Sequence, residues 1–199
     1  CCCCCCALVR PEPLGRLPRS PLEDAADAPH EHMLQHHSAA AAVTYIMGGD
    51  LETLHLSAIF NAIALLPPEL AMFLFATSEA VVLKLRSNAL LKQHATVRKI
   101  VIEQLTPPLG TKVDLGNRNL VFTAPWFWGR ISAEKVLLFD KTTRLCSGAK
   151  SSIDEYLKWD WIGAPWVWAD EKSDFYNGGN GALSIRSRAK IMQLLKMKE

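Results

Sequence analysis

Four short apolar runs, separated by segments of helical periodicity, constrain the fold of this 199-residue chain more than any other feature. The runs lack the apolar–polar alternation of a half-solvated strand, so both faces of each predicted strand are expected to be buried. The predicted strands are 41–47, 71–77, 97–103 and 136–139, and the predicted helices between the first three are 51–66 and 79–93. This order predicts an α/β fold with a mainly parallel sheet and helices on both faces.

The predicted helices carry recognisable start and stop signals. Asp50 is expected to cap the helix over 51–66, which Pro67-Pro68 ends. Ser151 and Ser152 are expected to cap a short helix, and Ser187 to cap a helix that runs through Lys198. Residues 117–131 are expected to be helical in part.

Residues 1–38 are predicted to be a disordered leader, followed by one domain over 39–199. Scattered prolines and the lack of an apolar period indicate disorder. The run Cys1–Cys6 cannot form an ordered disulfide framework; it is typical of an arbitrary fragment end, with a metal-binding or acylated tract as the alternative. The histidine-rich tract 30–37 is interpreted as a solvated polar segment rather than a metal site.

Charge and hydropathy exclude some classes of partner. The formal net charge is +2 and the basic residues are scattered, which gives no indication of a nucleic-acid partner. The cluster 186–198 is interpreted as the solvated face of a terminal helix. The most apolar span, 56–77, is interrupted by Pro67-Pro68-Glu69, so no membrane-spanning segment is predicted. No signal peptide is readable, and the sequence assigns no compartment.

Asp140 is the first candidate for chemistry, because it follows the predicted strand 136–139 at the carboxyl edge of the sheet. A carboxylate there can bind a divalent metal or a ribose hydroxyl, although capping and ion pairing are common alternatives. Trp126, Phe127 and Trp128 can line a sugar site, but packing of a helix onto the sheet is the favoured interpretation.

Two further stretches suggest a ligand site. Gly163-Ala164-Pro165 is expected to let backbone approach a ligand or to turn sharply, and Trp166 or Trp168 either stacks on a ligand ring or packs. Residues 177–181 (N-G-G-N-G) are expected to form an irregular loop before a strand at 182–185. In that loop Asn180 can offer its amide to a ligand, and Gly181 leaves room beside the backbone.

Residues 134–188 resemble a family of fungal glycosyltransferase-like domains of unknown function, domain family 5672. The resemblance is carried by V-L-L-F-D-K-T-T-R-L-C, D-E-Y-L-K-W-D-W-I-G-A-P-W and G-N-G-A-L-S-I-R-S-R, and it is looser over 41–131. It implies a Rossmann-like sheet similar to that of the A-type glycosyltransferases, which use nucleotide-sugar donors. Members continue beyond the helix after residue 187, so the domain is expected to be incomplete at its C-terminus.

The resemblance implies a donor-binding edge. Its predicted residues are Asp140, Thr142, Gly163, Ala164, Pro165, Trp166, Asn180 and Gly181. Related enzymes have a D-x-D whose acids hold Mn²⁺ or Mg²⁺ against the donor diphosphate, so Asp140 is the predicted metal ligand. Thr142 stands in place of the second acid, and Lys141 adds a positive charge that can replace a metal against phosphate or disfavour one.

These observations give three hypotheses. The first is a glycosyltransferase that transfers a sugar from a nucleotide donor to an acceptor, with no catalytic residue assigned. The second is a truncated or non-catalytic relative that retains the sheet. The third is an unrelated nucleotide-binding α/β protein such as a dehydrogenase, which the missing glycine fingerprint after the first strand disfavours.

Overall fold

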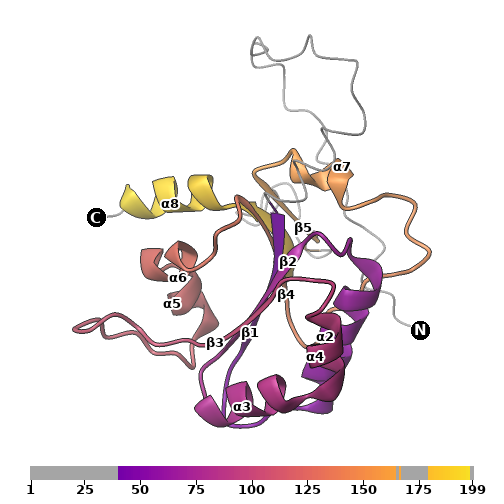
Figure 1. The fold of residues 1–199 in the computed structure, drawn as a ribbon. Coiled ribbons are helices and arrows are strands. Elements are labelled where there is room, and N and C mark those ends of the chain that lie inside the picture. The colour runs from indigo at the N-terminus through magenta and orange to yellow at the C-terminus, as the bar shows by residue number, and fades with distance from the viewer. Residues whose placement is uncertain (1–39, 165, 167–178, 198–199) are drawn as a thin grey trace, which may run out of the picture.

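The computed structural model describes residues 40–164, 166 and 179–197. Within these residues, six strands form one mixed sheet in the order β3-β2-β1-β4-β6-β5 (Figure 1). The strands are β1 (Ala40–Ile46), β2 (Ala71–Ala76), β3 (Ile100–Gln104), β4 (Lys135–Phe139), β5 (Trp161–Ala164) and β6 (Asn180–Ser187). The four strands from β3 to β4 are parallel, and β6 is antiparallel to both of its neighbours. The predicted α/β class and mostly parallel sheet are confirmed; the predicted leader lies outside the described residues.

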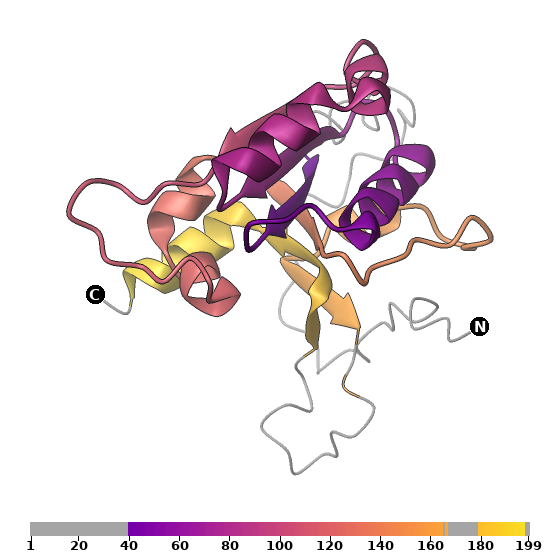
Figure 2. The ribbon, with the colours of Figure 1, turned by 90° about the horizontal axis from the view of Figure 1, so that it is seen from below.

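Helices cover both faces of the sheet (Figures 1 and 2). They are α2 (Thr53–Leu65), α3 (Glu79–Ser87), α4 (Ala89–His94), α5 (Arg118–Phe122), α6 (Pro125–Gly129), α7 (Asp154–Leu157) and α8 (Arg188–Lys196). Every residue of β1 is buried, as its unalternated sequence predicts. Ala42 packs with side chains of α2, α3 and α7, whereas Val43 packs with those of α5, α6 and α8. None of the helices in the described ranges is long and apolar enough to cross a bilayer.

The helix predicted over 79–93 is two helices. Asn88 has extended backbone (ψ 119°) between α3 and α4, and its side-chain oxygen accepts a hydrogen bond from the Leu91 nitrogen. Asparagine is a strong N-cap, so it starts a new helix here instead of continuing the old one. The prediction of one continuous helix misses this break.

The predicted caps are partly wrong. Glu52, not Asp50, caps α2, in a capping box in which His55 Nδ1 accepts a hydrogen bond from the Glu52 nitrogen at 3.2 Å. Ser187 caps α8 as predicted, because its hydroxyl accepts from the Lys190 nitrogen.

The serine cap predicted at 151–152 is also wrong. The residue before α7 is Ile153, which makes no side-chain cap bond. The Ser152 nitrogen instead donates to Glu155 Oε1 at 3.1 Å, and the Ser152 hydroxyl donates to Asp154 Oδ2. The acids of the first turn therefore hold the serine in place.

Two predicted irregular stretches belong to strands. Gly163 and Ala164 end β5, and Asn180 and Gly181 begin β6, so the corner and the glycine loop are misplaced in the prediction. The two strands pair, with an irregularity between Gly163 and Ala164. Low intrinsic strand propensity is overridden here by sheet pairing. Pro165, Trp168 and residues 177–178 lie outside the described residues.

The aromatic residues after α5 pack the core. Phe127 and Trp128 are fully buried, and the Phe127 ring lies edge-on to Phe75 at 5.6 Å. Trp128 Nε1 donates a 2.8 Å hydrogen bond to the Phe122 carbonyl. The packing interpretation is confirmed for these two residues.

The strand order reverses between β1 and β4. From β1 the chain proceeds to β2 and β3 on one side, and it returns to β4 on the other. In such sheets ligands bind beyond the carboxyl ends of the strands at the reversal. Here those ends lead into Met47 and Asp140, so the fold positions the predicted acid at the place where a ligand is expected.

Candidate functional site

Asp140 sits in a tight hydrogen-bonded turn after β4. Its Oδ1 accepts from the Thr142 nitrogen at 2.8 Å and from the Thr142 hydroxyl at 2.6 Å. Its Oδ2 accepts from Arg118 Nη1 at 3.0 Å. The Thr143 hydroxyl joins the turn to β6 by donating to the Ala182 carbonyl. The carboxylate therefore has a fixed orientation, with contacts at both oxygens.

These contacts keep Asp140 ionised. Burial alone raises the pKa of its carboxyl, but the hydrogen bonds from Thr142 and the charge of Arg118 outweigh burial, so the pKa lies below its usual value. At neutral pH the site therefore presents a carboxylate paired with a guanidinium.

Lys141 points to a different partner. Its Nζ lies 2.6 Å and 2.8 Å from the two carboxylate oxygens of Glu52, the residue that caps α2. This hydrogen bond lowers the pKa of Glu52. The ion pair connects the turn after β4 to the helix after β1, so it bridges the point where the strand order reverses.

Arg186 is a third cation at this edge, after Arg118 and Lys141, and it lies on the side of the sheet covered by α5. Its Nε donates to the Ser184 hydroxyl at 3.1 Å, and its guanidinium lies 5.8 Å from the centre of the Phe122 ring. Burial, with the charge of Arg118 as a second cause, lowers the pKa of Arg186 to about 10. Within the described residues, no carboxylate forms an ion pair with it.

The other predicted residues lie at the same edge. Gly181 follows Asn180 at the start of β6, and Ala164, at the end of β5, pairs with Asn180. Gly163 pairs with Ser184. Trp166 is partly buried and Pro165 lies outside the described residues. The topology thus brings the predicted glycine and alanine positions to the strand ends beside Asp140.

Sequence reasoning missed Arg118 and misassigned Arg186. Arg186 belongs to β6 and not to the solvated face of the terminal helix, so that interpretation of the basic cluster is wrong at this residue. A usable signal was present: Arg186 directly follows Ile185, the last residue of the predicted strand 182–185. Continuing that strand by one residue places the charge on the face opposite the buried Ile185. Arg118 gave no such signal, because only the fold brings α5 to Asp140.

The residues beside Asp140 fit a divalent metal poorly. Mg²⁺ and Mn²⁺ favour hard oxygen ligands, usually with more than one carboxylate or with phosphate oxygens. Here the second position is Thr142, whose hydroxyl donates to Asp140, and the other oxygen faces Arg118. Among the described residues, no group of three metal-ligating side chains forms.

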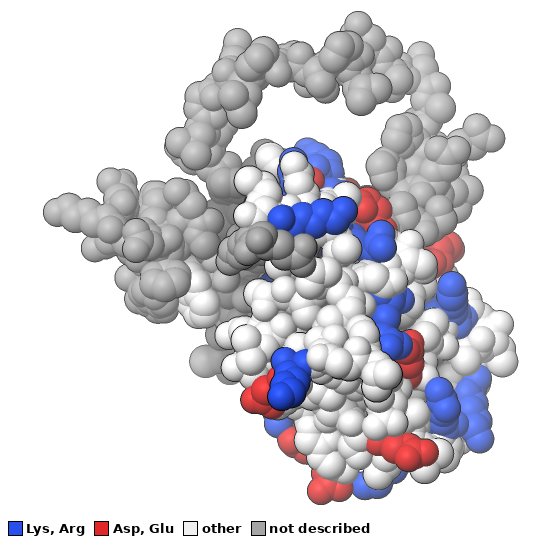
Figure 3. All heavy atoms as spheres, turned by 90° about the vertical axis from the view of Figure 1, so that its left-hand side faces the viewer, with Lys and Arg blue, Asp and Glu red and all other residues white. Residues whose placement is uncertain are grey.

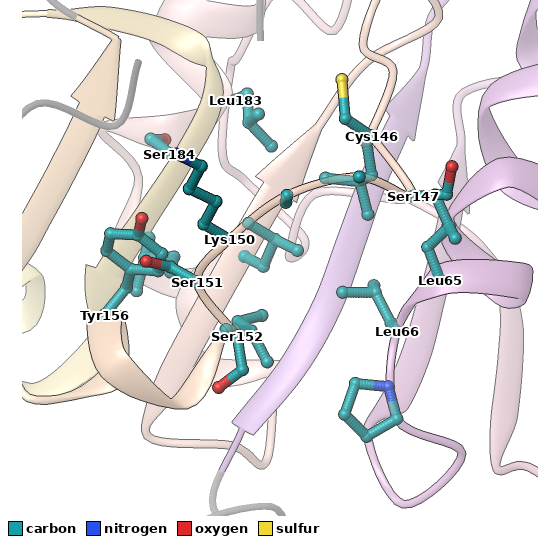
Figure 4. A pocket seen from close by; sticks show the side chains of 17 residues that line it. Leu65, Leu66, Cys146, Ser147, Lys150, Ser151, Ser152, Tyr156, Leu183 and Ser184 are labelled. Carbon is teal, nitrogen blue, oxygen red and sulfur yellow. The ribbon is translucent and has the colours of Figure 1, made fainter. Parts of the chain in front are cut away.

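A pocket lies elsewhere, between the end of α2 and the stretch that leads into α7 (Figure 4). Its volume is about 680 Å³. Leu65 and Leu66 line one side, and Ser151, Ser152 and Tyr156 line the other. Among the described residues, no predicted donor-binding residue contributes to its wall, so in this part of the chain the cavity is separate from the Asp140 edge.

The surface over α5, α6 and α8 shows no strong electrostatic pattern. In Figure 3, basic and acidic side chains are interspersed among uncharged atoms on this face. This face therefore shows no extended surface of one charge.

Comparison with known proteins gives one family. A profile described as "Protein of unknown function (DUF5672)" matches residues 112–199, which is less than half of the chain. The chain is similar to that family over these residues, as the sequence resemblance predicts. The match includes Arg118, Asp140 and Arg186. No curated protein and no solved structure matches the chain.

Proposed function

We propose that this chain is a glycosyltransferase that binds a nucleotide-sugar donor at the Asp140 edge and transfers the sugar to an acceptor. The observation that carries the proposal is the position of Asp140, directly after β4 and beside the reversal of strand order. The resemblance of residues 134–188 to glycosyltransferase-like domains supports the same site.

The proposed donor lies across the ends of β4, β5 and β6. Ala164 and Gly181, both partly buried, offer backbone with little side-chain bulk, as a bound ribose or sugar ring requires, whereas Gly163 is buried and supports them from within β5. Trp166 supplies an aromatic face, and the predicted contribution of the Asn180 amide lies outside the described side chains. Asp140 and Thr142 form the floor of the site through their mutual hydrogen bonds.

A binding and turnover experiment tests this proposal. Calorimetric titration with a panel of uridine, guanosine and adenosine diphosphate sugars, each with Mn²⁺ and with EDTA, is expected to identify a donor. Release of nucleoside diphosphate from that donor is then measured with and without candidate acceptors. Absence of binding to every nucleotide sugar contradicts the proposal.

A matched pair of variants localises the site. Asp140→Asn is expected to change donor affinity, because it removes the charge at the proposed site. Asp160→Asn is the control, because Asp160 precedes β5 at the opposite end of the sheet and pairs only weakly with Lys135 at 3.7 Å. An equal effect of both variants contradicts a donor site at Asp140.

A non-catalytic relative is the second candidate, and the contacts of Asp140 favour it. Both carboxylate oxygens already accept hydrogen bonds within the chain, from Thr142 and Arg118. Such a protein binds the donor without releasing nucleoside diphosphate. The turnover measurement separates it from the enzyme.

A further inference from the structure

Among the described residues, Arg186 has no carboxylate as an ion-pair partner. Its side chain is partly buried on β6, and its Nε uses the Ser184 hydroxyl as acceptor. Removing a guanidinium from water is costly unless charge or hydrogen bonds compensate it. No carboxylate among the described residues does so. The remaining nitrogens are therefore suited to bind an anion, since the described part of the chain supplies none.

A second guanidinium faces the same space. Arg118 and Phe122 are four residues apart on α5 and therefore lie on one side of that helix. Arg186 lies over the Phe122 ring, so Arg118 and Arg186 approach each other. Arg118 donates to Asp140 from Nη1, so its other guanidinium nitrogens remain to bind an anion. Arg118, Arg186 and Asp140 together carry a net positive charge.

Gly181 sets the position of the Arg186 head group. A Cβ at residue 181 lies only 2.8 Å from Arg186 Nη2, so any side chain there displaces the guanidinium. The head group consequently reaches the first residues of β6. That is the edge where Asp140 leaves β4, because Phe139 pairs with Leu183.

We propose that Arg118 and Arg186 bind the diphosphate of the nucleotide-sugar donor directly, in the role that a divalent metal has in the D-x-D enzymes. The inference rests on the proposed function. Planar guanidinium forks match the oxygens of phosphate groups and can contact two oxygens at once. Two forks at one strand edge suit the two phosphates of a nucleoside diphosphate. The poor metal-ligand set around Asp140 agrees with this arrangement.

The experiment measures binding of inorganic pyrophosphate and of uridine and guanosine diphosphate in EDTA. We expect measurable binding by the unmodified chain, and about tenfold or greater weakening in Arg186→Met. Arg186→Lys keeps the charge without the fork and is expected to show an intermediate loss. Lys92→Gln, on exposed α4, is the matched control for loss of a cation and is expected to bind normally.

Gly181→Ala keeps both arginines and moves one. We expect this variant to bind pyrophosphate more weakly while its far-ultraviolet circular dichroism stays unchanged. It therefore tests the position of Arg186 even if Arg186→Met fails to fold. Unchanged affinity in both variants overturns the proposal. So does binding that requires Mn²⁺ and vanishes in EDTA.

The two proposals fail in different ways. Pyrophosphate binding that depends on Arg186, without binding of any nucleotide sugar, supports the anion site and contradicts the glycosyltransferase proposal. Nucleotide-sugar binding that ignores Arg186 and Gly181 supports the glycosyltransferase proposal and overturns the guanidinium site.

Discussion

Arg118 Nη1 lies 3.0 Å from Asp140 Oδ2, so the acid at the end of β4 is paired with a cation of the chain itself. Both side chains are partly buried, with 33% and 22% of their surface exposed, and solvent screens the pair only in part. The carboxylate holds Arg118 at the strand edge. This gives Asp140 a positioning role, which differs from the metal-ligand role that its place after the strand suggests.

Asp140→Asn separates these two roles. Asparagine keeps an oxygen that can accept from Thr142, but an amide nitrogen in place of Oδ2 cannot accept from Arg118 and no longer holds it at the strand edge. We therefore expect pyrophosphate to bind about fivefold more weakly in EDTA, corresponding to roughly 1 kcal/mol. The measurement is calorimetric titration at low ionic strength. Loss of a Mn²⁺-dependent interaction in this variant would instead identify Asp140 as a metal ligand.

The sequence predicts the strands well and the site only in part. The unalternated runs locate β1, β2 and β4 because both faces of those strands are buried, and β4 therefore leads correctly to Asp140. β3 is only partly buried, and it begins at Ile100 rather than at the predicted residue 97. The start of β6 is missed, because glycine and asparagine resemble a loop until a partner strand pairs with them. Arg118 is missed because α5 reaches Asp140 only through the packing of Phe127 and Trp128 beneath it.

His55 makes stability depend on pH. Burial is the main cause that lowers its pKa, with the charge of Glu52 opposing, and Nδ1 accepts a hydrogen bond that requires the neutral ring. Below about pH 6.5 the unfolded state takes up a proton that the folded state resists. The stabilising contribution of His55 is therefore complete above that pH and is lost as the pH falls below it.

His55→Gln tests this dependence. Glutamine can make the same capping-box bond to the Glu52 nitrogen but does not titrate. Urea unfolding between pH 7.5 and 5 should show a smaller loss of stability in the variant, by at most about 1.4 kcal/mol per pH unit. His94→Gln is the control for removal of a histidine. Parallel curves for His55→Gln and the unmodified chain would disprove the role of His55.

Arg98 stabilises the connection between α2 and β2. Only 5% of its surface is exposed, and its guanidinium donates to the carbonyls of Ile63, Leu66 and Leu70. Arg98→Met leaves these carbonyls without their donor, and we expect a loss of about 3 kcal/mol in the free energy of unfolding.

An exposed arginine provides the comparison for Arg98. Arg86 donates to a single carbonyl, that of Ile102, from an exposed position, so Arg86→Met should cost less than about 1 kcal/mol. Urea unfolding followed by circular dichroism measures both variants. Arg98→Lys should recover little stability, because an ammonium cannot reproduce the planar fork. Equal losses at residues 98 and 86 would contradict this account.

Loss of the indole nitrogen is expected to change the free energy of unfolding by different amounts at Trp126 and Trp128. Trp128 Nε1 donates to the Phe122 carbonyl at 2.8 Å, whereas Trp126 Nε1 is buried with no hydrogen-bond partner among the described residues. Trp128→Phe leaves that carbonyl unpaired and creates a small cavity in the core, so we expect a loss of about 2–3 kcal/mol. Trp126→Phe removes an unsatisfied donor, which offsets the lost packing, and the net change should stay within about 1 kcal/mol.

Urea unfolding followed by circular dichroism avoids the change in fluorescence that either substitution causes, and equal m-values in the two variants show that the midpoints report stability. A larger loss in Trp126→Phe than in Trp128→Phe would show that the Trp126 nitrogen has a partner in solution.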